Sequence, residues 1–516
     1  MGFGMGLCHG LVRGLLSAGL GLAATALPVL AQTSTVPQPG PAKKQPPVRL
    51  VQNDPAQRAP AARPQSGGPR TLNDALAATY SNQPALQAER AKLRSIDENV
   101  PQALAGWRPT VVLAGTVGYG DGKSVILSAP NSLTGARSTI TTPTGRQIAT
   151  AQATVTQNLY TGGRTQANVN RSKNQVMAER ATLIAQEQTS FLAAVTAYVG
   201  VIQTRQLLEL QRNNEQVLNK QLQATNDRYR VGEITRTDVA QAEAALAGAR
   251  AQRETAEGNL AIARGTFQQI VGVQPPDDMV EPQPLALPVK TEQEAAALAS
   301  VNNPAVISAL FNDAAAKDFV DAQLGALMPQ VGLQGQTFQQ ENSGARGAEA
   351  NGYQVIMQVS VPLYQGGTEY AAVRAARQTQ QQTQRQVDDQ KRIAVQSAVQ
   401  FYSALVSARA AAASTRTQIR SNEIALEGVT REAIVGSRTT LDVLTAQQTL
   451  LTSRTNLVQN LSQLVTASFQ VAAAIGRLTA RDMRLPVPLY DETAYYNAVK
   501  DRWIGLGDYA TDQPGR

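Results

Sequence analysis

The chain has 516 residues, of which 42% are hydrophobic, and its formal net charge is +8 at pH 7. Its only cysteine and histidine are Cys8 and His9. Both fall in a predicted leader, so the exported protein lacks thiolate catalysis, disulfides, histidine bases and the usual zinc ligand sets. The basic residues are scattered among Gln, Asn and Thr, which favours solvated helix faces over a nucleic-acid surface.

Residues 1–31 have the pattern of a cleavable secretory signal peptide. Arg13 is their only charge, a mostly apolar stretch follows, and Val-Leu-Ala precedes Gln32. Cys8 comes before the apolar stretch, so it does not resemble a lipoprotein acceptor. Residues 32–70 are rich in proline and nearly free of large apolar side chains, which predicts a disordered linker. A proline-rich docking ligand is the alternative.

The rest of the chain contains two copies of one unit. Leu159, Tyr160 and the Gly162-Gly163 pair recur 204 positions later, with Gly366-Gly367 as the second pair. Upstream, an Asn-x-Pro motif recurs at an offset of 220 positions, so 16 extra residues lie in one loop of the first copy. We therefore expect repeat 1 at residues 71–272, a proline-rich connector at 273–290, repeat 2 at 291–476, and a C-terminal tail at 477–516 near the middle of the helical part.

Each copy begins with a helical segment followed by two strands. Residues 72–107 are mainly helical, with breaks or kinks at Pro84 and Pro101, and the second copy has one helix over about 292–327. In the first copy a short strand, a Gly/Ser/Thr-rich loop and a return strand follow. In the second copy, residues 353–363 alternate between apolar and polar, which is typical of a barrel strand facing lipid on one side. A half-buried strand of a soluble sheet would alternate in the same way.

Very long helices follow the two Gly-Gly pairs. Neither proline nor a glycine cluster interrupts residues 164–230, and a helix of this length spans roughly 100 Å. A shorter helix returns over about 235–272. The second copy repeats this pattern, with an apolar residue at every seventh position from Leu450 to Val471, which predicts coiled-coil packing.

No run of about eighteen apolar residues occurs outside the leader, so we expect any membrane crossing to be by strands. Four strands cannot close, because the smallest known transmembrane barrels have about eight. The predicted fold is therefore mainly α with a β-barrel part that is shared between chains.

These motifs resemble one family. Leu-Tyr-x-Gly-Gly at both junctions, Val-Gly-x-x-Thr-x-x-Asp-Val at both helical turns and the paired Asn-x-Pro starts are similar to the TolC family of outer-membrane channel-tunnel proteins. The tail around Tyr490 and Trp503 resembles the type I protein secretion branch. The resemblance implies a homotrimer with a twelve-stranded barrel in the outer membrane of a Gram-negative bacterium. A coiled-coil tunnel then crosses the periplasm to a periplasmic adaptor (membrane fusion) protein and an inner-membrane ABC or RND-type pump.

The helical turns contain candidate gate residues. Thr235 with Asp238, and Thr439 with Asp442, have the spacing of capping boxes. The resemblance also places Asp442 in a threefold ring at the pore tip, where carboxylates favour cations and can bind divalent ions. By the same resemblance, Arg438 ties the second hairpin to Asp238; the alternative is a surface salt bridge of little consequence.

Two features of the tips concern closure and docking. The family pattern has a tyrosine at the position of Ala433 and a second acid at Thr445, and both departures bear on how tightly the gate closes. The turns at the tips are Val231-Gly232 and Val435-Gly436, and the resemblance implies that they contact the adaptor.

The strand-to-helix junctions contain the glycine pairs at 162–163 and 366–367. These glycines supply the permissive backbone angles that such turns need.

The predicted function is a passive exit duct of a tripartite efflux or type I secretion system, not an enzyme and without a cofactor. The alternative is a non-conducting periplasmic coiled-coil spacer. The sequence is equally compatible with efflux of small molecules and with protein secretion.

Overall fold

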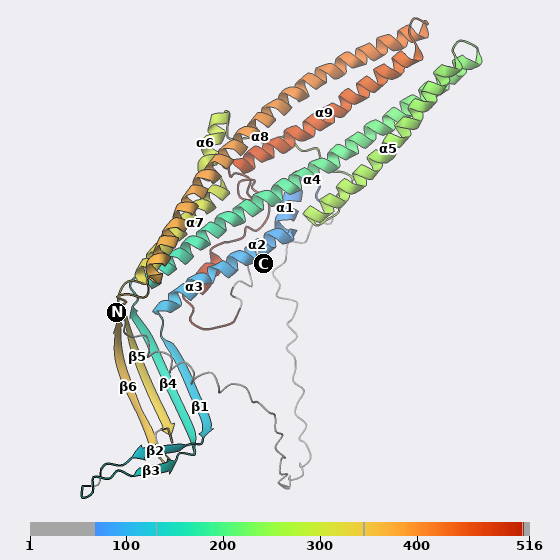
Figure 1. The fold of residues 1–516 in the computed structure, drawn as a ribbon. Coiled ribbons are helices and arrows are strands. Elements are labelled where there is room, and N and C mark those ends of the chain that lie inside the picture. The colour runs from blue at the N-terminus through green and yellow to red at the C-terminus, as the bar shows by residue number, and fades with distance from the viewer. Residues whose placement is uncertain (1–67, 131, 344–345, 508, 510–516) are drawn as a thin grey trace, which may run out of the picture. The chain divides into compact units, whose positions relative to one another are not determined.

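A computed structural model describes residues 68–130, 132–343, 346–507 and 509. The predicted signal peptide and all of the linker before residue 68 lie outside the described residues. The described part consists mainly of long helices, with a four-stranded sheet at one end (Figure 1).

The first copy begins with helices α1 (Leu72–Asn82), α2 (Pro84–Asp97) and α3 (Asn99–Leu104), and a 3-10 turn η2 (Ala105–Trp107). Thr71 and Asp74 form a capping box at the start of α1. The break at Pro84 agrees with the prediction, because Pro84 opens α2, where its missing N–H costs no helical hydrogen bond. The second break comes before Pro101, since α3 already begins at Asn99.

In the second copy, the prediction of one continuous helix is wrong. The structure has α6 (Glu292–Asn302) and α7 (Pro304–Gly325), separated at Asn303. Proline disfavours helical angles in the residue before it, and the Asn303 side chain accepts a hydrogen bond from the N–H of Ala305 (2.9 Å), which caps α7. The Asn-x-Pro motif therefore breaks the helix in both copies.

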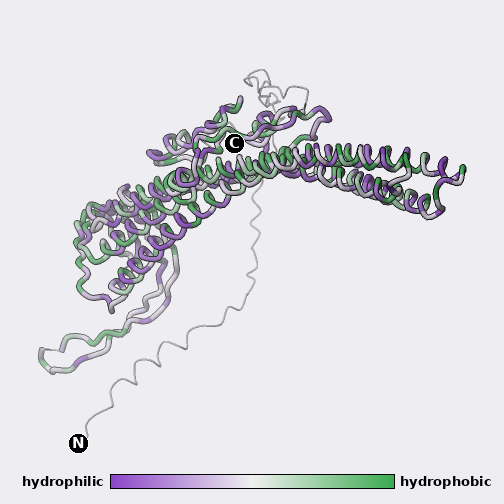
Figure 2. The backbone as a smooth tube through the Cα atoms, turned by 90° about the horizontal axis from the view of Figure 1, so that it is seen from above, coloured by the Kyte–Doolittle hydropathy of each residue, from purple (hydrophilic) through white to green (hydrophobic). Residues whose placement is uncertain are grey.

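The long helices agree with the prediction. They are α4 (Arg164–Arg230) with its return helix α5 (Arg236–Val271), and α8 (Thr368–Ile434) with α9 (Thr440–Ala474). Each pair packs side by side, and α7 lies between α4 and α8 (Figure 1). Among the described helices, α4 alone contains a stretch whose length and mean hydropathy would allow it to cross a bilayer, although polar residues interrupt that stretch. Half of that stretch is buried within the chain, and Figure 2 shows polar and apolar positions interspersed along the long helices.

Equivalent contacts recur in the two copies. The Tyr198 hydroxyl lies 2.7 Å from the carbonyl oxygen of Arg70, and the Tyr402 hydroxyl donates to the carbonyl oxygen of Lys290. The two tyrosines are related by the offset of 204 and the two carbonyls by that of 220. The internal repeat therefore extends to tertiary contacts.

The sheet is antiparallel, in the order β1-β4-β5-β6. Its strands are β1 (Thr110–Gly120), β4 (Arg146–Tyr160), β5 (Gln330–Glu341) and β6 (Glu349–Ser360). The predicted return strand of the second copy reached residue 363, but β6 ends at Ser360. Pro362, which lacks an N–H to donate, stands just beyond it.

The extra length of the first copy contains a second hairpin. The sequence predicted only a Gly/Ser/Thr-rich loop here, whereas β2 (Lys123–Leu127) pairs with β3 (Thr139–Pro143). Cross-strand pairs such as Ile126 with Ile140 bring β-branched side chains together, which favours extended pairing.

The C-terminal tail contains the short helix α10 (Ala494–Val499). Tail residues such as Leu478 and Leu485 join the largest hydrophobic cluster, which also includes Phe191 and Tyr198 of α4. The tail then follows α2, where the Tyr495 hydroxyl donates to Glu98 (2.7 Å), and reaches Arg108 beside β1.

Candidate functional site

The two faces of the four-stranded sheet differ in chemistry. The strand registers place Val111, Val155 and Val355 on one face and Thr116, Gln152 and Gln354 on the other. Large apolar side chains on the first face are exposed to solvent in the single chain: Val111, Leu113, Val117, Val355, Met357 and Val359. An apolar face of this size, on strands of 11 to 15 residues, fits the hydrocarbon layer of a membrane.

The opposite face contains a row of hydrogen-bonded polar side chains. Gln354 Nε2 donates to Gln336 Oε1 (2.7 Å), and Gln336 Nε2 donates to Gln152 Oε1 (3.0 Å). On the neighbouring strand pair, the hydroxyls of Thr116 and Thr150 lie 2.6 Å apart. This face is suited to water, so the sheet has the two-sided chemistry of a channel wall.

Exposed tyrosines bracket the apolar face. Tyr119 and Tyr353 lie towards one end of the strands, and Tyr160 and Tyr364 lie at the other. At about 3.3 Å per residue and a tilt of about 40°, the 12 residues of β6 span about 28 Å along the membrane normal. Aromatic residues at both limits of the band match the two interfaces of a bilayer.

The strand-to-helix junctions use the left-handed backbone region. Gly162 and Gly163 have φ of 65° and 82°, and Gly366 and Gly367 have φ of 68° and 85°. A Cβ atom on Gly162 would also lie 2.4 Å from the carbonyl oxygen of Gly325, whereas a Cβ on Gly366 meets nothing within 4 Å. Both junctions need glycine for the backbone, and only the first needs it for packing within one chain.

The far ends of the helical hairpins are tight turns. Gly232 and Gly436 have φ of 78° and 79°, and Val231 and Val435 are exposed beside them. Backbone bonds from Glu233 to Arg228 and from Ser437 to Glu432, both 3.0 Å, close the turns. Each hairpin thus presents an exposed apolar side chain at its end.

Both predicted capping boxes are formed. The Asp238 carboxylate accepts from the N–H (3.0 Å) and hydroxyl of Thr235, and that of Asp442 accepts from the N–H (3.0 Å) and hydroxyl of Thr439. The Thr439 backbone and side-chain hydrogen bonds lower the pKa of Asp442, with a smaller contribution from Arg438. Asp442 is therefore ionised at neutral pH and carries a fixed negative charge at the tip.

The structure does not join Arg438 to Asp238 within one chain. Among the described residues, the ion-pair partner of Arg438 is Glu432 (2.9 Å), and Asp238 is held in its capping box. Arg228 pairs with Glu233, and its Nη2 also donates to the carbonyl oxygen of Ala433 on the other hairpin (3.5 Å). The sequence interpretation missed Arg228, Glu233 and Glu432, although charged residues flanking both turns could have indicated them.

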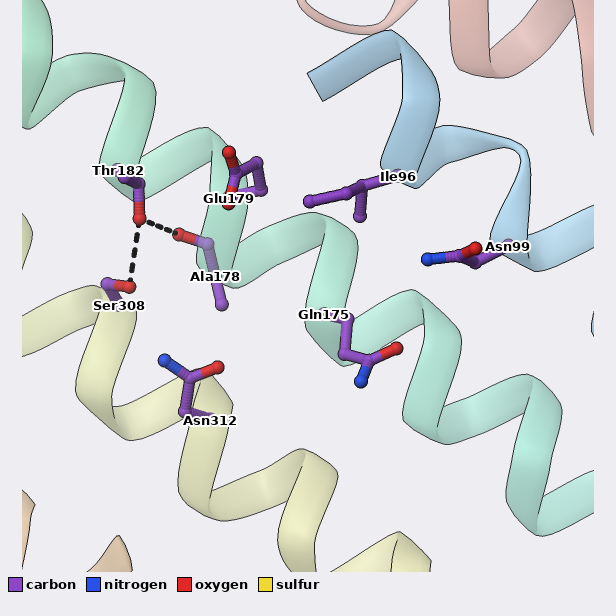
Figure 3. A pocket seen from close by; sticks show the side chains of 8 residues that line it. All are labelled: Ile96, Asn99, Gln175, Ala178, Glu179, Thr182, Ser308 and Asn312. Atoms are coloured by element: carbon purple, nitrogen blue, oxygen red, sulfur yellow. Dashed lines mark hydrogen bonds between the residues drawn. The ribbon is translucent and has the colours of Figure 1, made fainter. Parts of the chain in front are cut away.

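A polar hollow of about 220 Å³ lies where the two copies meet, between α2, α4 and α7 (Figure 3). Thr182 donates to the carbonyl oxygen of Ala178 (3.0 Å) and lies 3.1 Å from the Ser308 hydroxyl. Glu179 also lines the hollow; burial raises its pKa, and it pairs with Lys92 (2.7 Å). Across the described part of the chain, no three Asp, Glu, His or Cys residues gather as a metal site. We assign this hollow to the helix packing rather than to a ligand.

Comparisons with known proteins agree with this geometry. The family model described as outer membrane efflux protein matches residues 75–273 and 296–477, which correspond to the two copies. The chain is similar to outer membrane efflux protein BepC of Brucella suis biovar 1 (strain 1330), at 35% identity over 442 residues, covering 84% of this chain and 92% of BepC. It is 25% identical to alkaline protease secretion protein AprF of Pseudomonas aeruginosa, over 58% of this chain and 64% of AprF.

Among solved structures, CusC matches with a TM-score of 0.68 and 15% identity, covering 78% of this chain and 91% of CusC. At 15% identity, that likeness shows the fold alone. The assignment to a family rests on the family model and on the similarity to BepC. The chain belongs to the outer membrane efflux protein family, whose TolC-like members form trimers, and it is a non-enzymatic channel of tripartite efflux and secretion systems in the Gram-negative outer membrane.

Proposed function

We propose that three copies of this chain form a passive exit duct that docks onto a periplasmic adaptor protein and an inner-membrane ABC or RND-type pump. The observation that carries this proposal is the two-sided sheet, with an exposed apolar face opposite the Gln152, Gln336 and Gln354 row. Its edge strands, β1 and β6, have one neighbour each. Pairing of β6 with β1 of the next chain gives twelve strands, within the range of known barrels.

A matched pair of substitutions tests the barrel against the alternative of a non-conducting spacer. Val117 and Thr116 are neighbours in β1 with side chains on opposite faces. Val117→Lys places a charge in lipid near the interface marked by Tyr119 and should cost about 1–2 kcal/mol of folding free energy, whereas Thr116→Lys should fold and alter conductance. The measurements are recovery of trimers from the outer membrane and single-channel current in planar bilayers. Equal recovery of the two variants, without current, would favour the spacer.

We place the gate at the hairpin tips, with Asp442, Asp238 and Arg438 as its residues. Three ionised Asp442 side chains would form a ring that favours cations. In this proposal Arg438 contacts Asp238 in the closed trimer, in competition with the pairing to Glu432 that the single chain adopts.

Conductance measurements distinguish the latch from a surface pair. Asp238→Ala and Arg438→Ala should both raise single-channel conductance, because each removes one partner of the latch. Glu432→Ala is the control, since it frees Arg438 and should leave conductance unchanged or lower. A rise with Glu432→Ala alone would show that the pair within one hairpin, and not the proposed latch, closes the tip.

The adaptor is proposed to dock on the tips formed by Val231, Gly232, Val435 and Gly436. The exposure of both valines at the ends of the hairpins supports this. Val231→Asp or Val435→Asp keeps the glycine backbone intact and should reduce crosslinking to the adaptor. Undiminished crosslinking in the double variant would place the contact elsewhere.

The transported cargo is proposed to be either small toxic molecules or a secreted protein. Similarity to BepC, named an efflux protein, supports the first, and similarity to AprF, named an alkaline protease secretion protein, supports the second. Deleting the gene and measuring both toxicant susceptibility and protein export would separate the two. We further propose that residues 71–272 and 291–476 act as two wall units joined by the 273–290 connector.

A further inference from the structure

The C-terminal tail leaves a cluster of exposed apolar side chains beside the base of the sheet. Trp503 is 67% exposed, Ile504 is 91% exposed, and Leu506 is fully exposed. These residues follow α10 and a tail that is otherwise well packed on α2 and α4. Large apolar side chains grouped in this way mark an interaction surface.

Arg108 fixes the position of this cluster. Its Nη1 donates to the carbonyl oxygen of Arg502 (2.6 Å), and its guanidinium lies over the Trp503 ring, 5.1 Å from the ring centre. Arg108 stands two residues before Thr110, where β1 begins. Arg502 and Trp503 of the tail therefore lie at the level where the apolar band of the barrel starts, marked by Val111 and Leu113.

The chemistry at this level is that of a membrane interface. The chain has two tryptophans: Trp107 directly precedes Arg108 in the sequence, and Trp503 lies under the Arg108 guanidinium. Tyr160 and Tyr364 mark the same end of the strands. Tryptophan and tyrosine concentrate where hydrocarbon meets headgroups, and Arg side chains there reach the headgroup phosphates.

We propose that Trp503, Ile504 and Leu506 insert into the periplasmic leaflet of the outer membrane, while Arg108 and Arg502 contact phospholipid headgroups. The contact of Trp503 with Arg108, two residues before β1, places this surface at the base of the sheet, and the two arginine cations complement the phosphates. Each chain of the trimer contributes one such anchor. Because the tail also packs on α2 and α4, the anchor connects these two helices to the membrane.

The two tryptophans allow a direct test in the full-length trimer. Trp107→Phe leaves Trp503 as the single tryptophan, and the protein is reconstituted into phosphatidylethanolamine and phosphatidylglycerol vesicles. We expect Trp503 emission at short wavelength, most of its intensity lost when the lipids carry brominated acyl chains, and little quenching by iodide. A control with both tryptophans changed to Phe and Val231→Trp at the hairpin tip should show the opposite pattern.

Two other outcomes would overturn the proposal. Quenching by iodide but not by brominated lipid would place the cluster in water or in the pore. Quenching by neither would show that a neighbouring chain covers it. In the Trp107→Phe background, Ile504→Asp with Leu506→Asp should abolish lipid quenching while trimers and conductance persist; unchanged lipid quenching would also count against the anchor. None of these readouts depends on the adaptor or the pump.

Discussion

The ascending helices of the two copies occupy equivalent places in the repeat but have different neighbours. In the second copy, α7 is packed between α4 and α8 of the same chain. In the first copy, α2 packs on α4 and is covered by the C-terminal tail, of which there is one per chain. The two copies of the repeat therefore differ in what covers them: helices of the same chain cover α7, and the C-terminal tail covers α2.

One pair of equivalent residues illustrates this. Asp97 of α2 is 1% exposed, and within the described structure neither of its carboxylate oxygens has a hydrogen-bond partner. The equivalent residue in α7, at the offset of 220, is Lys317, which is largely exposed and pairs with Asp313 (2.7 Å). The first copy therefore buries a carboxyl group at the position where the second copy has an exposed lysine, paired with the buried Asp313.

The largest expected effect concerns the junction glycines. Gly162→Ala should cost about 4 kcal/mol, because φ is positive and the new Cβ clashes with Gly325 and Met328. Gly366→Ala, the matched control, should cost only the backbone strain of about 1–2 kcal/mol. Thermal unfolding of detergent-solubilised trimers measures both. Equal costs would mean that the next chain packs on Gly366 as α7 packs on Gly162.

Asp97 should make stability depend on pH. Burial raises its pKa to about 7, the neighbouring Glu98 adds to this, and Arg180 and Arg94 oppose it. The unfolded chain has a pKa of about 3.9 at this group, so the folded state binds the proton more tightly. The tighter proton binding stabilises the folded state. This stabilisation is fully present below about pH 4, where Asp97 is protonated in both states, and it is lost as the pH rises through about 7.

Asp97→Asn removes the group that titrates. At pH 8 the free energy of unfolding of the variant should therefore be about 2–4 kcal/mol higher than that of the wild type, with little difference at pH 4. Melting curves at the two pH values measure this. Lys317→Gln, at the equivalent position, keeps Asp97 and should therefore retain the wild-type loss of stability between pH 4 and pH 8. A parallel loss of stability from pH 4 to pH 8 in Asp97→Asn and wild type would contradict the assignment.

A smaller effect is expected at the equivalent tyrosines. The Tyr198 hydroxyl is placed to donate to the carbonyl of Arg70 or Val280, each 2.7 Å away, and burial raises its pKa to about 12. Tyr198→Phe should cost about 1 kcal/mol, because it leaves buried carbonyl groups without that donor. Tyr402→Phe should cost less, since that contact is exposed to water. Chemical unfolding compares the two, and a reversed order would contradict the burial argument.

The smallest effects are expected at the tips, where the copies carry ion pairs of opposite polarity. Arg228 and Glu432 occupy equivalent positions, and they pair with Glu233 and Arg438 across their turns. Glu233→Gln and Glu432→Gln should each leave the melting temperature of the detergent-solubilised trimer almost unchanged, because both ion pairs are exposed to solvent. A larger change in either variant would show that its pair holds the hairpin together.

The sequence predicted most elements because their signals are local. The bounds of α4, the capping boxes of Asp238 and Asp442, and the glycine turns each depend on a few neighbouring residues. Three local signals were misread or overlooked. They were the break at Pro304, the end of β6 before Pro362, and the pairing of β2 with β3 inside a loop.

The candidate site was less accessible to sequence reasoning. The identity of the tip residues followed from the motifs, but the partner of Arg438 did not, since Glu432 and Asp238 are both acids within plausible reach. The row of Gln152, Gln336 and Gln354 depends on strand register across both copies. The contact of Arg108 with Trp503 joins residues 395 positions apart, and no local pattern indicates it.

By itself the sequence determined the repeated unit, the lengths of the long helices α4, α5, α8 and α9, and the two-sided chemistry of its strands, because periodicity, caps and glycine angles act over a few residues. Tertiary structure alone decided what covers each copy. Gly162 is packed against α7, whereas a Cβ atom on Gly366 would meet nothing within 4 Å in one chain. Asp97 is buried, whereas Lys317 is exposed. The tail reaches Arg108 at the base of β1. The physical reason is that packing and desolvation depend on which distant segments meet, and equivalent residues of a repeat meet different ones.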